Sequence, residues 1–147
     1  MQRIILILAC VLLLPMMMLG QRGKNGQVEK ELMEYKLKFL SQEMELEPSQ
    51  QQKFVEVYTR MMTEKRRVFA AAVESENRVK KDPNASAKAY EQANAAMAQA
   101  KIQEGKIDKK YDAEFRKFLT PKQIYKMKEG EEKFRKMLKE VRGKKRR

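Results

Sequence analysis

The sequence has no histidine and no tryptophan, and its single cysteine, Cys10, falls within the first 20 of its 147 residues. Without histidine, the chain lacks the commonest general base and the commonest transition-metal ligand of proteins. Because no cysteine follows Cys10, the rest of the chain has neither a disulfide nor a thiol nucleophile. It also has no glycine-rich phosphate loop. We therefore expect no catalytic residue, no cofactor and no metal site, and the sequence disfavours an enzyme.

Glycine and proline are scarce, with 6 and 4 residues respectively. No segment alternates apolar and polar residues as a half-buried strand does, whereas apolar residues recur every three or four positions along most of the chain. This pattern predicts an all-α fold of about four helices with long antiparallel, hairpin-like packing. The first two helices are expected over 27–45 and 48–80, the third has an apolar face from Tyr90 to Phe118, and the fourth follows Thr120.

The N-terminal residues have the pattern of a secretory signal. A positive start at Arg3 is followed by an unbroken apolar run, Ile4–Leu14, and then by Pro15. We expect residues 1–21 to direct export. Two alternatives stay open, namely that the segment is retained as a membrane anchor or that Cys10 is lipidated. After the signal, we expect one helical domain over 22–142 and a disordered basic tail over 143–147.

Basic residues far outnumber acidic ones, with 33 Lys and Arg against 20 Asp and Glu, a formal net charge of +13 at pH 7. Such a charge destabilises the compact state through self-repulsion and attracts acidic partners. Nucleic acid would be the expected partner in the cytoplasm, but an export signal argues against it. Unfolded polypeptides, anionic lipid headgroups and polyanionic envelope material remain as classes of partner.

Two related pentapeptides each end one expected helix and begin the next: Leu46-x-Pro48-x-Gln50 and Leu119-Thr120-Pro121-x-Gln123. Proline suits the first turn of a helix, and threonine followed by glutamine three residues later forms a capping box. Glu47 stands where the second copy has Thr120, so we expect the reciprocal capping bond to be lost in the first copy. We interpret both motifs as helix-start signals and markers of fold, with no ligand role. A further turn, Asp82-Pro83-Asn84, is expected to separate the second and third helices, with Asn84 or Ser86 as the cap.

With two such motifs in a helical chain behind an export signal, the sequence resembles the Spy/CpxP family of bacterial periplasmic proteins, whose signature is a pair of L-T-x-x-Q motifs. The resemblance covers essentially all of the chain after the signal. It implies a small helical protein of the periplasm, often a cradle-shaped homodimer, and the better-known member is an ATP-independent chaperone for unfolded envelope proteins. Other members regulate envelope-stress signalling or sense metals. Metal sensing is disfavoured here because no histidine or mature cysteine is present.

The expected function is therefore that of a holdase for unfolded or misfolded envelope proteins, with no nucleic acid partner and with membrane contact only if the signal is retained. The candidate client-binding surface is Met61 and Met62 beside Lys65-Arg66-Arg67, because thioether side chains adapt to varied apolar segments and cations attract acidic ones. A core position for the methionines and a solvated face for the cations are the alternative interpretations. The alternative function is a regulator that binds a membrane sensor of envelope stress.

Overall fold

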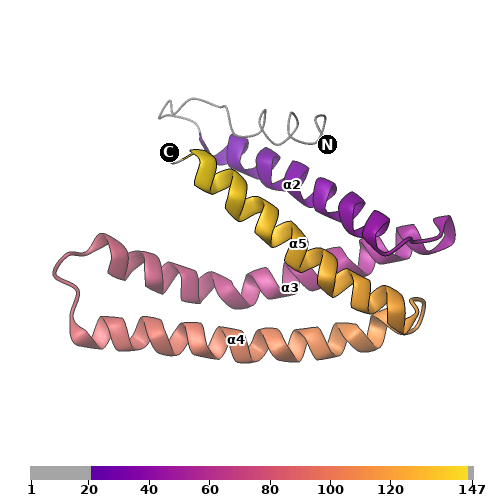
Figure 1. Cartoon of the computed structure of the whole chain (residues 1–147). Helices are drawn as coiled ribbons and strands as arrows, with labels where there is room; N and C mark the ends of the chain where they lie inside the picture. Colours follow the sequence, from indigo (N-terminus) through magenta and orange to yellow (C-terminus); the bar gives the residue numbers. More distant parts are fainter. Residues whose placement is uncertain (1–20, 146–147) are drawn as a thin grey trace. The chain divides into compact units, whose positions relative to one another are not determined.

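The computed structural model describes residues 21–145, and this part of the chain is all-α, as predicted (Figure 1). Its helices are α2 (Gln21–Glu43), α3 (Pro48–Lys81), α4 (Ala87–Phe115) and α5 (Pro121–Lys145). Within the described range, none of them combines the length and the apolar character that crossing a bilayer requires. The expected signal lies outside the described residues except for Gln21, as does the end of the expected tail, 146–147.

Tertiary contacts divide the chain into two compact units, of which the structure describes residues 21–40 and 41–145. The first unit contains most of α2, in which Leu37 and Leu40 are buried. The second contains the last turn of α2 and the whole of α3, α4 and α5. The single domain expected over 22–142 spans both units.

The chain turns sharply between α2 and α3. The backbone N–H of Leu46 donates to the carbonyl of Ser41 (3.0 Å), and that of Glu45 donates to Gln42 (3.1 Å). These two bonds and the positive φ of Glu45, 53°, form a Schellman motif at a position where glycine is usual. The Glu45 carboxylate accepts a hydrogen bond from Lys126 Nζ at 2.6 Å. This contact with Lys126 of α5 fixes the side chain of Glu45 in the turn.

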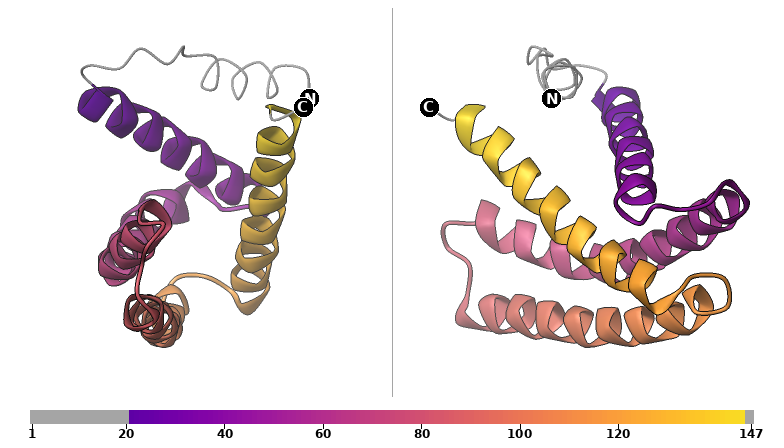
Figure 2. Two further views of the ribbon diagram at one scale, coloured as in Figure 1. Left: turned by 90° about the vertical axis from the view of Figure 1, so that its left-hand side faces the viewer. Right: turned by 45° about the vertical axis from the view of Figure 1, so that its right-hand side comes forward.

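α3 and α4 lie side by side and antiparallel (Figures 1 and 2). Two ion pairs between the helices show the antiparallel direction. Arg60 of α3 pairs with Glu114 of α4 (3.2 Å), and Glu64, one turn later in α3, pairs with Lys110, one turn earlier in α4 (2.8 Å). The residues that α3 turns toward the interior recur at alternating steps of four and three, which is the repeat of a coiled coil. They are Phe54, Tyr58, Met61, Lys65, Val68, Ala72, Ser75 and Val79, all buried or half-buried. The matching residues of α4 are mostly small: Ala89, Ala93, Ala96, Ala100, Gln103 and Ile107.

This repeat corrects one expectation from the sequence. Tyr90 was expected on the apolar face of its helix, but its side chain is 50% exposed. The 3.6-residue period of a free helix gives a broad apolar face that includes Tyr90. A coiled-coil contact is narrower, and it leaves Tyr90 outside the interior.

The turn between α3 and α4 forms as its residues predict. The backbone N–H of Asn84 donates to Asp82 Oδ1 at 2.9 Å, and Ser86 Oγ accepts from the N–H of Ala89 at 3.2 Å. Ser86 is therefore the N-cap of α4, one of the two residues proposed for that position.

α5 packs against the end of the α3/α4 pair where α3 begins and α4 ends. Phe54, Tyr58 and Phe115 form an aromatic cluster there, with ring centroids 5.4 and 6.1 Å from Phe54. Ile124 and Met127 of α5 are buried, and Lys128 forms an ion pair with Asp112 of α4 (3.6 Å). Toward its C-terminal end α5 diverges from α3 and α4 (Figures 1 and 2).

The C-terminal residues differ from the expected disordered tail. α5 continues through Gly143 and Lys144 and ends at Lys145. A glycine inside a helix costs about 1 kcal/mol relative to alanine, but lysine and arginine are good helix formers. Cations in the last turn also interact favourably with the helix dipole. The tail was expected because charge was weighed more heavily than helix propensity.

The paired helix starts and a candidate binding surface

The second motif forms the capping box that its sequence predicts. The backbone N–H of Gln123 donates to Thr120 Oγ1 (3.2 Å), and that of Thr120 donates to Gln123 Oε1 (3.0 Å). Pro121 follows as the first residue of α5, and Leu119 is buried just before it. The motif therefore satisfies two backbone donors that a helix start leaves without partners.

In the first motif the reciprocal bond expected to be lost is present. The backbone N–H of Glu47 donates to Gln50 Oε1 at 3.1 Å. The expectation was wrong because this half of the capping box needs only a backbone N–H and the glutamine, whatever side chain precedes the helix. Leu46 is buried, like Leu119 of the second copy. Pro48 is the first residue of α3, as Pro121 is of α5.

The two motif glutamines bind each other. Gln50 Nε2 donates to Gln123 Oε1 at 3.1 Å, and Gln123 Nε2 donates back to Gln50 Oε1 at 2.9 Å. Gln50 Nε2 also donates to the carbonyl of Phe118 at 2.9 Å. This reciprocal amide pair fastens the start of α3 to the start of α5, 73 residues apart in sequence. Sequence reasoning missed the contact, although its signal was available in the glutamine that both motifs share.

A second polar contact joins α3 to α5. The hydroxyl of Tyr58, a fully buried side chain, donates to Glu131 Oε1 at 2.5 Å. Burial raises the pKa of Tyr58, and the charge and hydrogen bond of Glu131 and the charge of Asp108 raise it further. The phenol therefore stays protonated at neutral pH and fixes α5 on α3.

The structure separates the residues of the candidate client-binding surface. Met61 is only 3% exposed and belongs to the core. Lys65 is directed to α4, where its Nζ lies 2.5 Å from Asp108 and 3.5 Å from Glu104. Burial opposes its charge, but the hydrogen bond to Asp108 and the nearby carboxylates raise the pKa of Lys65 overall.

Of the other candidates, Met62 is half-buried, and Arg66 and Arg67 are exposed. For Met61 the alternative interpretation, a core position, is the one the structure shows. Met61 and Lys65 both occupy positions of the coiled-coil repeat, where side chains point inward. Because Lys65 is a cation at a position that is otherwise apolar in this repeat, the coiled-coil repeat is hard to recognise in the sequence.

Met62 and Arg66 are part of a longer row of surface residues. Steps of seven, four, three and four place five side chains of α3 on one face of the helix. We call this row the outer stripe, and it consists of Val55, Met62, Arg66, Phe69 and Val73. Val55 and Val73 are 40% and 42% exposed, and Met62 and Phe69 are half-buried. The stripe thus presents apolar side chains beside a guanidinium.

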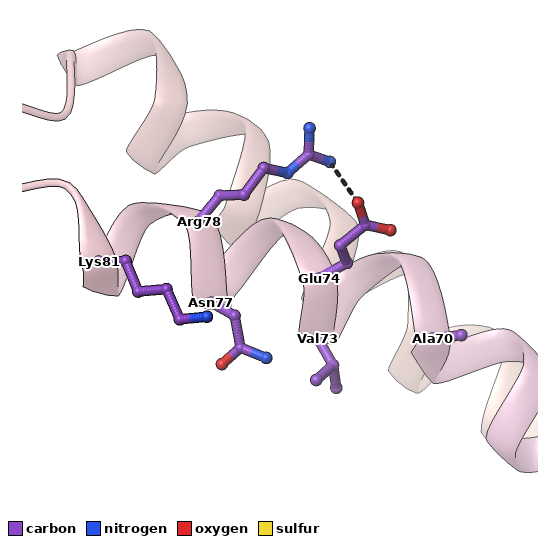
Figure 3. A pocket seen from close by; sticks show the side chains of 6 residues that line it. All are labelled: Ala70, Val73, Glu74, Asn77, Arg78 and Lys81. Carbon is purple, nitrogen blue, oxygen red and sulfur yellow. Dashed lines mark ion pairs between the residues drawn. The ribbon is translucent and has the colours of Figure 1, made fainter. Parts of the chain in front are cut away.

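At its C-terminal end the outer stripe runs into a shallow hollow of about 340 Å³ (Figure 3). Six residues of α3 line it: Ala70, Val73, Glu74, Asn77, Arg78 and Lys81. Val73 and Asn77 project from one side of the helix, whereas Glu74 and Arg78 form an ion pair of 3.7 Å (Figure 3). Its lining is apolar at Ala70 and Val73 and cationic at Lys81.

Charge is distributed unevenly over the helices. α3 has 8 basic and 4 acidic residues, α4 has 5 of each, and α5 has 10 basic and 4 acidic residues. The positive field therefore arises mainly from α3 and α5.

In the part of the chain that the structure describes, no three acidic side chains gather as a metal site would require. No model of a protein family, no curated protein and no solved structure matches the chain.

Proposed function

We propose that this protein is an exported, ATP-independent holdase of the Spy/CpxP type that binds unfolded or misfolded proteins of the bacterial cell envelope. The observation that carries the proposal is the outer stripe, in which exposed Val55 and Val73 and half-buried Met62 and Phe69 surround Arg66. An unfolded polypeptide offers apolar side chains and carboxylates together. The stripe complements the apolar side chains, and the excess of basic residues on α3 attracts the carboxylates.

The contribution of each apolar contact is small. Fully burying a valine contributes about 1.5–3 kcal/mol. Val73 is 42% exposed, so a bound client can gain about 1 kcal/mol at this residue. Attraction between the basic helices and an acidic client speeds encounter, and weak apolar contacts then retain it. Many weak contacts permit release without ATP.

The relation to the Spy/CpxP family is supported by the way the two motifs work together. Both copies place a proline at the first helical position, and their glutamines Gln50 and Gln123 bind each other. A repeated motif whose copies meet in space has a structural reason to occur twice. A periplasmic location and a homodimer are further parts of this proposal.

Light scattering from an aggregating client protein, with and without the purified protein, tests the proposal. We predict suppression at a stoichiometric ratio. The double variant Met62→Gln/Val73→Gln should need about tenfold more protein for the same suppression, because two contacts of about 1 kcal/mol each are weakened. The matched control is Ile102→Gln/Tyr125→Gln, which removes two exposed apolar side chains of α4 and α5. It should change the required concentration less than about twofold.

A parent protein that suppresses no aggregation would overturn the holdase proposal. Equal losses in the two double variants would show that the outer stripe is not the binding surface. Recovery of one stoichiometric membrane sensor from envelope extracts, in place of many unfolded clients, would instead favour the regulatory function.

A further inference from the structure

The C-terminal part of α5 is a second surface of distinctive chemistry. Lys139, Arg142 and Lys144 are exposed, and among the described side chains, those of residues 26–144, no ion pair joins any of them to a carboxylate. Cations nearer the middle of α5 differ in this respect, because Lys133 pairs with Glu43 and Lys136 with Glu132. The excess of positive charge is therefore concentrated at the end of the helix.

Residues 139–144 hold three basic side chains, Lys139, Arg142 and Lys144, and one acidic side chain, Glu140. We call this segment the basic end of α5.

The helical conformation determines which side chains lie together around this part of α5. Steps of four and three place Arg135, Lys139 and Arg142 on one face of α5. Met137, Leu138 and Val141 lie on another face and are half-buried. The two faces together make an amphipathic basic helix end, and α5 diverges from α3 and α4 in this region (Figures 1 and 2).

We propose that the basic end of α5 binds the anionic surface of a lipid bilayer. Clustered Lys and Arg side chains on an amphipathic helix complement anionic headgroups, and each one near the surface raises the affinity about fivefold. The half-buried side chains beside the cations suit the boundary between headgroups and acyl chains; they are Met137, Leu138 and Val141. A nucleic acid backbone offers no apolar surface for them to contact. The choice of a bilayer over nucleic acid also rests on the export that is part of the proposed function.

Such binding is peripheral and reversible. The apolar side chains of this helix end are partly buried in the fold already, so attraction of charge supplies most of the affinity, and salt weakens it. The consequence for the holdase is a location at the membrane surface, independent of whether the N-terminal segment is retained.

Sedimentation of the full chain with vesicles tests this proposal. The vesicles consist either of phosphatidylcholine alone or of phosphatidylcholine mixed with phosphatidylglycerol. We expect the parent to bind the mixed vesicles at least tenfold more tightly at physiological salt. The triple variant Lys139→Gln/Arg142→Gln/Lys144→Gln should lose about 100-fold, which corresponds to three factors of five. Binding to phosphatidylcholine alone measures any contribution of the N-terminal segment, which every variant retains.

The matched control is Lys101→Gln/Lys106→Gln/Lys109→Gln, which removes three exposed lysines of α4 and gives the same net charge. It should bind mixed vesicles within about threefold of the parent. Equal losses in the two triple variants would overturn the proposal, because net charge alone would then govern binding. So would a parent that does not distinguish the vesicles, or one that binds duplex DNA more tightly than mixed vesicles at the same salt.

Two further measurements keep this result separate from the holdase function. Far-UV circular dichroism should show the same helicity in both triple variants and the parent. Without vesicles, the triple variant of α5 should suppress client aggregation as the parent does, since it leaves the outer stripe intact. A failure of vesicle binding with intact suppression would overturn only the membrane proposal.

Discussion

At the scale of single residues, the contact with the largest structural reach is the amide pair of Gln50 and Gln123. Each glutamine binds the other and also accepts a hydrogen bond from the backbone at the start of its own helix. Gln50 adds a bond to the carbonyl of Phe118 in the turn before α5. One pair of side chains thus caps two helices and holds their starts together.

Replacing Gln50 by alanine should destabilise the protein by about 1–2 kcal/mol, because partly buried groups of Gln123 and Phe118 lose their partner. Urea denaturation measures this cost. The double variant Gln50→Ala/Gln123→Ala should cost less than the sum of the single variants, since both remove the same bond. Gln52→Ala, at an exposed position of α3, is the control. If Gln50→Ala is no more costly than this control, the pair has no structural role.

Tyr58 predicts a dependence of stability on pH. Burial raises the pKa of the folded-state phenol, and the charge and hydrogen bond of Glu131 add to this. Below a pH of about 10 the phenol is protonated in both states, so its contribution is fully present. Above it, only the unfolded state loses the proton readily, and the free energy of unfolding should fall by about 1.4 kcal/mol per pH unit.

Denaturation at pH values on both sides of 10 measures this slope. Tyr58→Phe should remove the fall in the free energy of unfolding that Tyr58 causes above pH 10. Tyr125→Phe should leave it unchanged, because the Tyr125 side chain is 64% exposed. Equal slopes in the parent and in Tyr58→Phe would show that the phenol ionises as easily in the folded protein as in the unfolded one.

The sequence allowed some of these residues to be interpreted correctly but not their partners. Thr120 and Gln123 were identified as a capping box because its two members lie three residues apart. The bonds between Gln50 and Gln123 and between Tyr58 and Glu131 join residues 73 positions apart. Spacing within one helix carries no information on such contacts.

At the scale of helices, small side chains determine how α3 and α4 pack. Ala72 of α3 and Ala93 and Ala100 of α4 are buried. Because alanine side chains are small, the backbones of the two helices approach closely, and the alanine methyl groups fill the space between them. The alternating steps of four and three keep these residues facing the partner helix along the whole pair.

Enlarging a residue in this seam should therefore be costly. Ala72→Leu is expected to destabilise the protein by about 1–3 kcal/mol through overpacking. The neighbouring variant Ala71→Leu changes an exposed position and should have an effect within about 0.5 kcal/mol. Thermal or urea denaturation of the two variants gives the comparison. Equal effects would show that α3 and α4 do not pack tightly at this point.

The two helix starts marked by proline were predicted to the residue, whereas α2 begins at Gln21 and not at the expected residue 27. Pro48 and Pro121 gave the first residues of α3 and α5 because proline suits the first turn. The end of α5 was missed, since a run of cations argues equally for a solvated tail and for a favourable helix end. Lys65 was proposed for the client-binding surface because it is a cation, but it occupies a position where the coiled-coil repeat usually has an apolar residue.

At the scale of the whole molecule, net charge and exposed apolar side chains occur on the same helices. α3 carries the outer stripe with an excess of basic residues, and α5 carries the basic end. Sequence alone predicted a basic binding protein and proposed Met61 and Lys65 for its binding surface, with a core position for the methionines as the alternative. In the folded protein Met61 and Lys65 face the interior, whereas Phe69 and Val73 lie on the outer stripe. Which residues form the surface of α3 therefore depends on how α3 packs against α4.

The central claim is that the outer stripe of α3 binds unfolded clients, and oxidation of adjacent methionines tests it most directly. Met62 lies on the stripe, whereas Met61 is only 3% exposed. In the free protein, Met62 should be oxidised faster than Met61, because oxidation follows exposure. With a saturating unfolded client, mass spectrometry should show Met62 oxidation slowed severalfold and Met61 unchanged. An unchanged rate at Met62 while the client is bound would contradict the account.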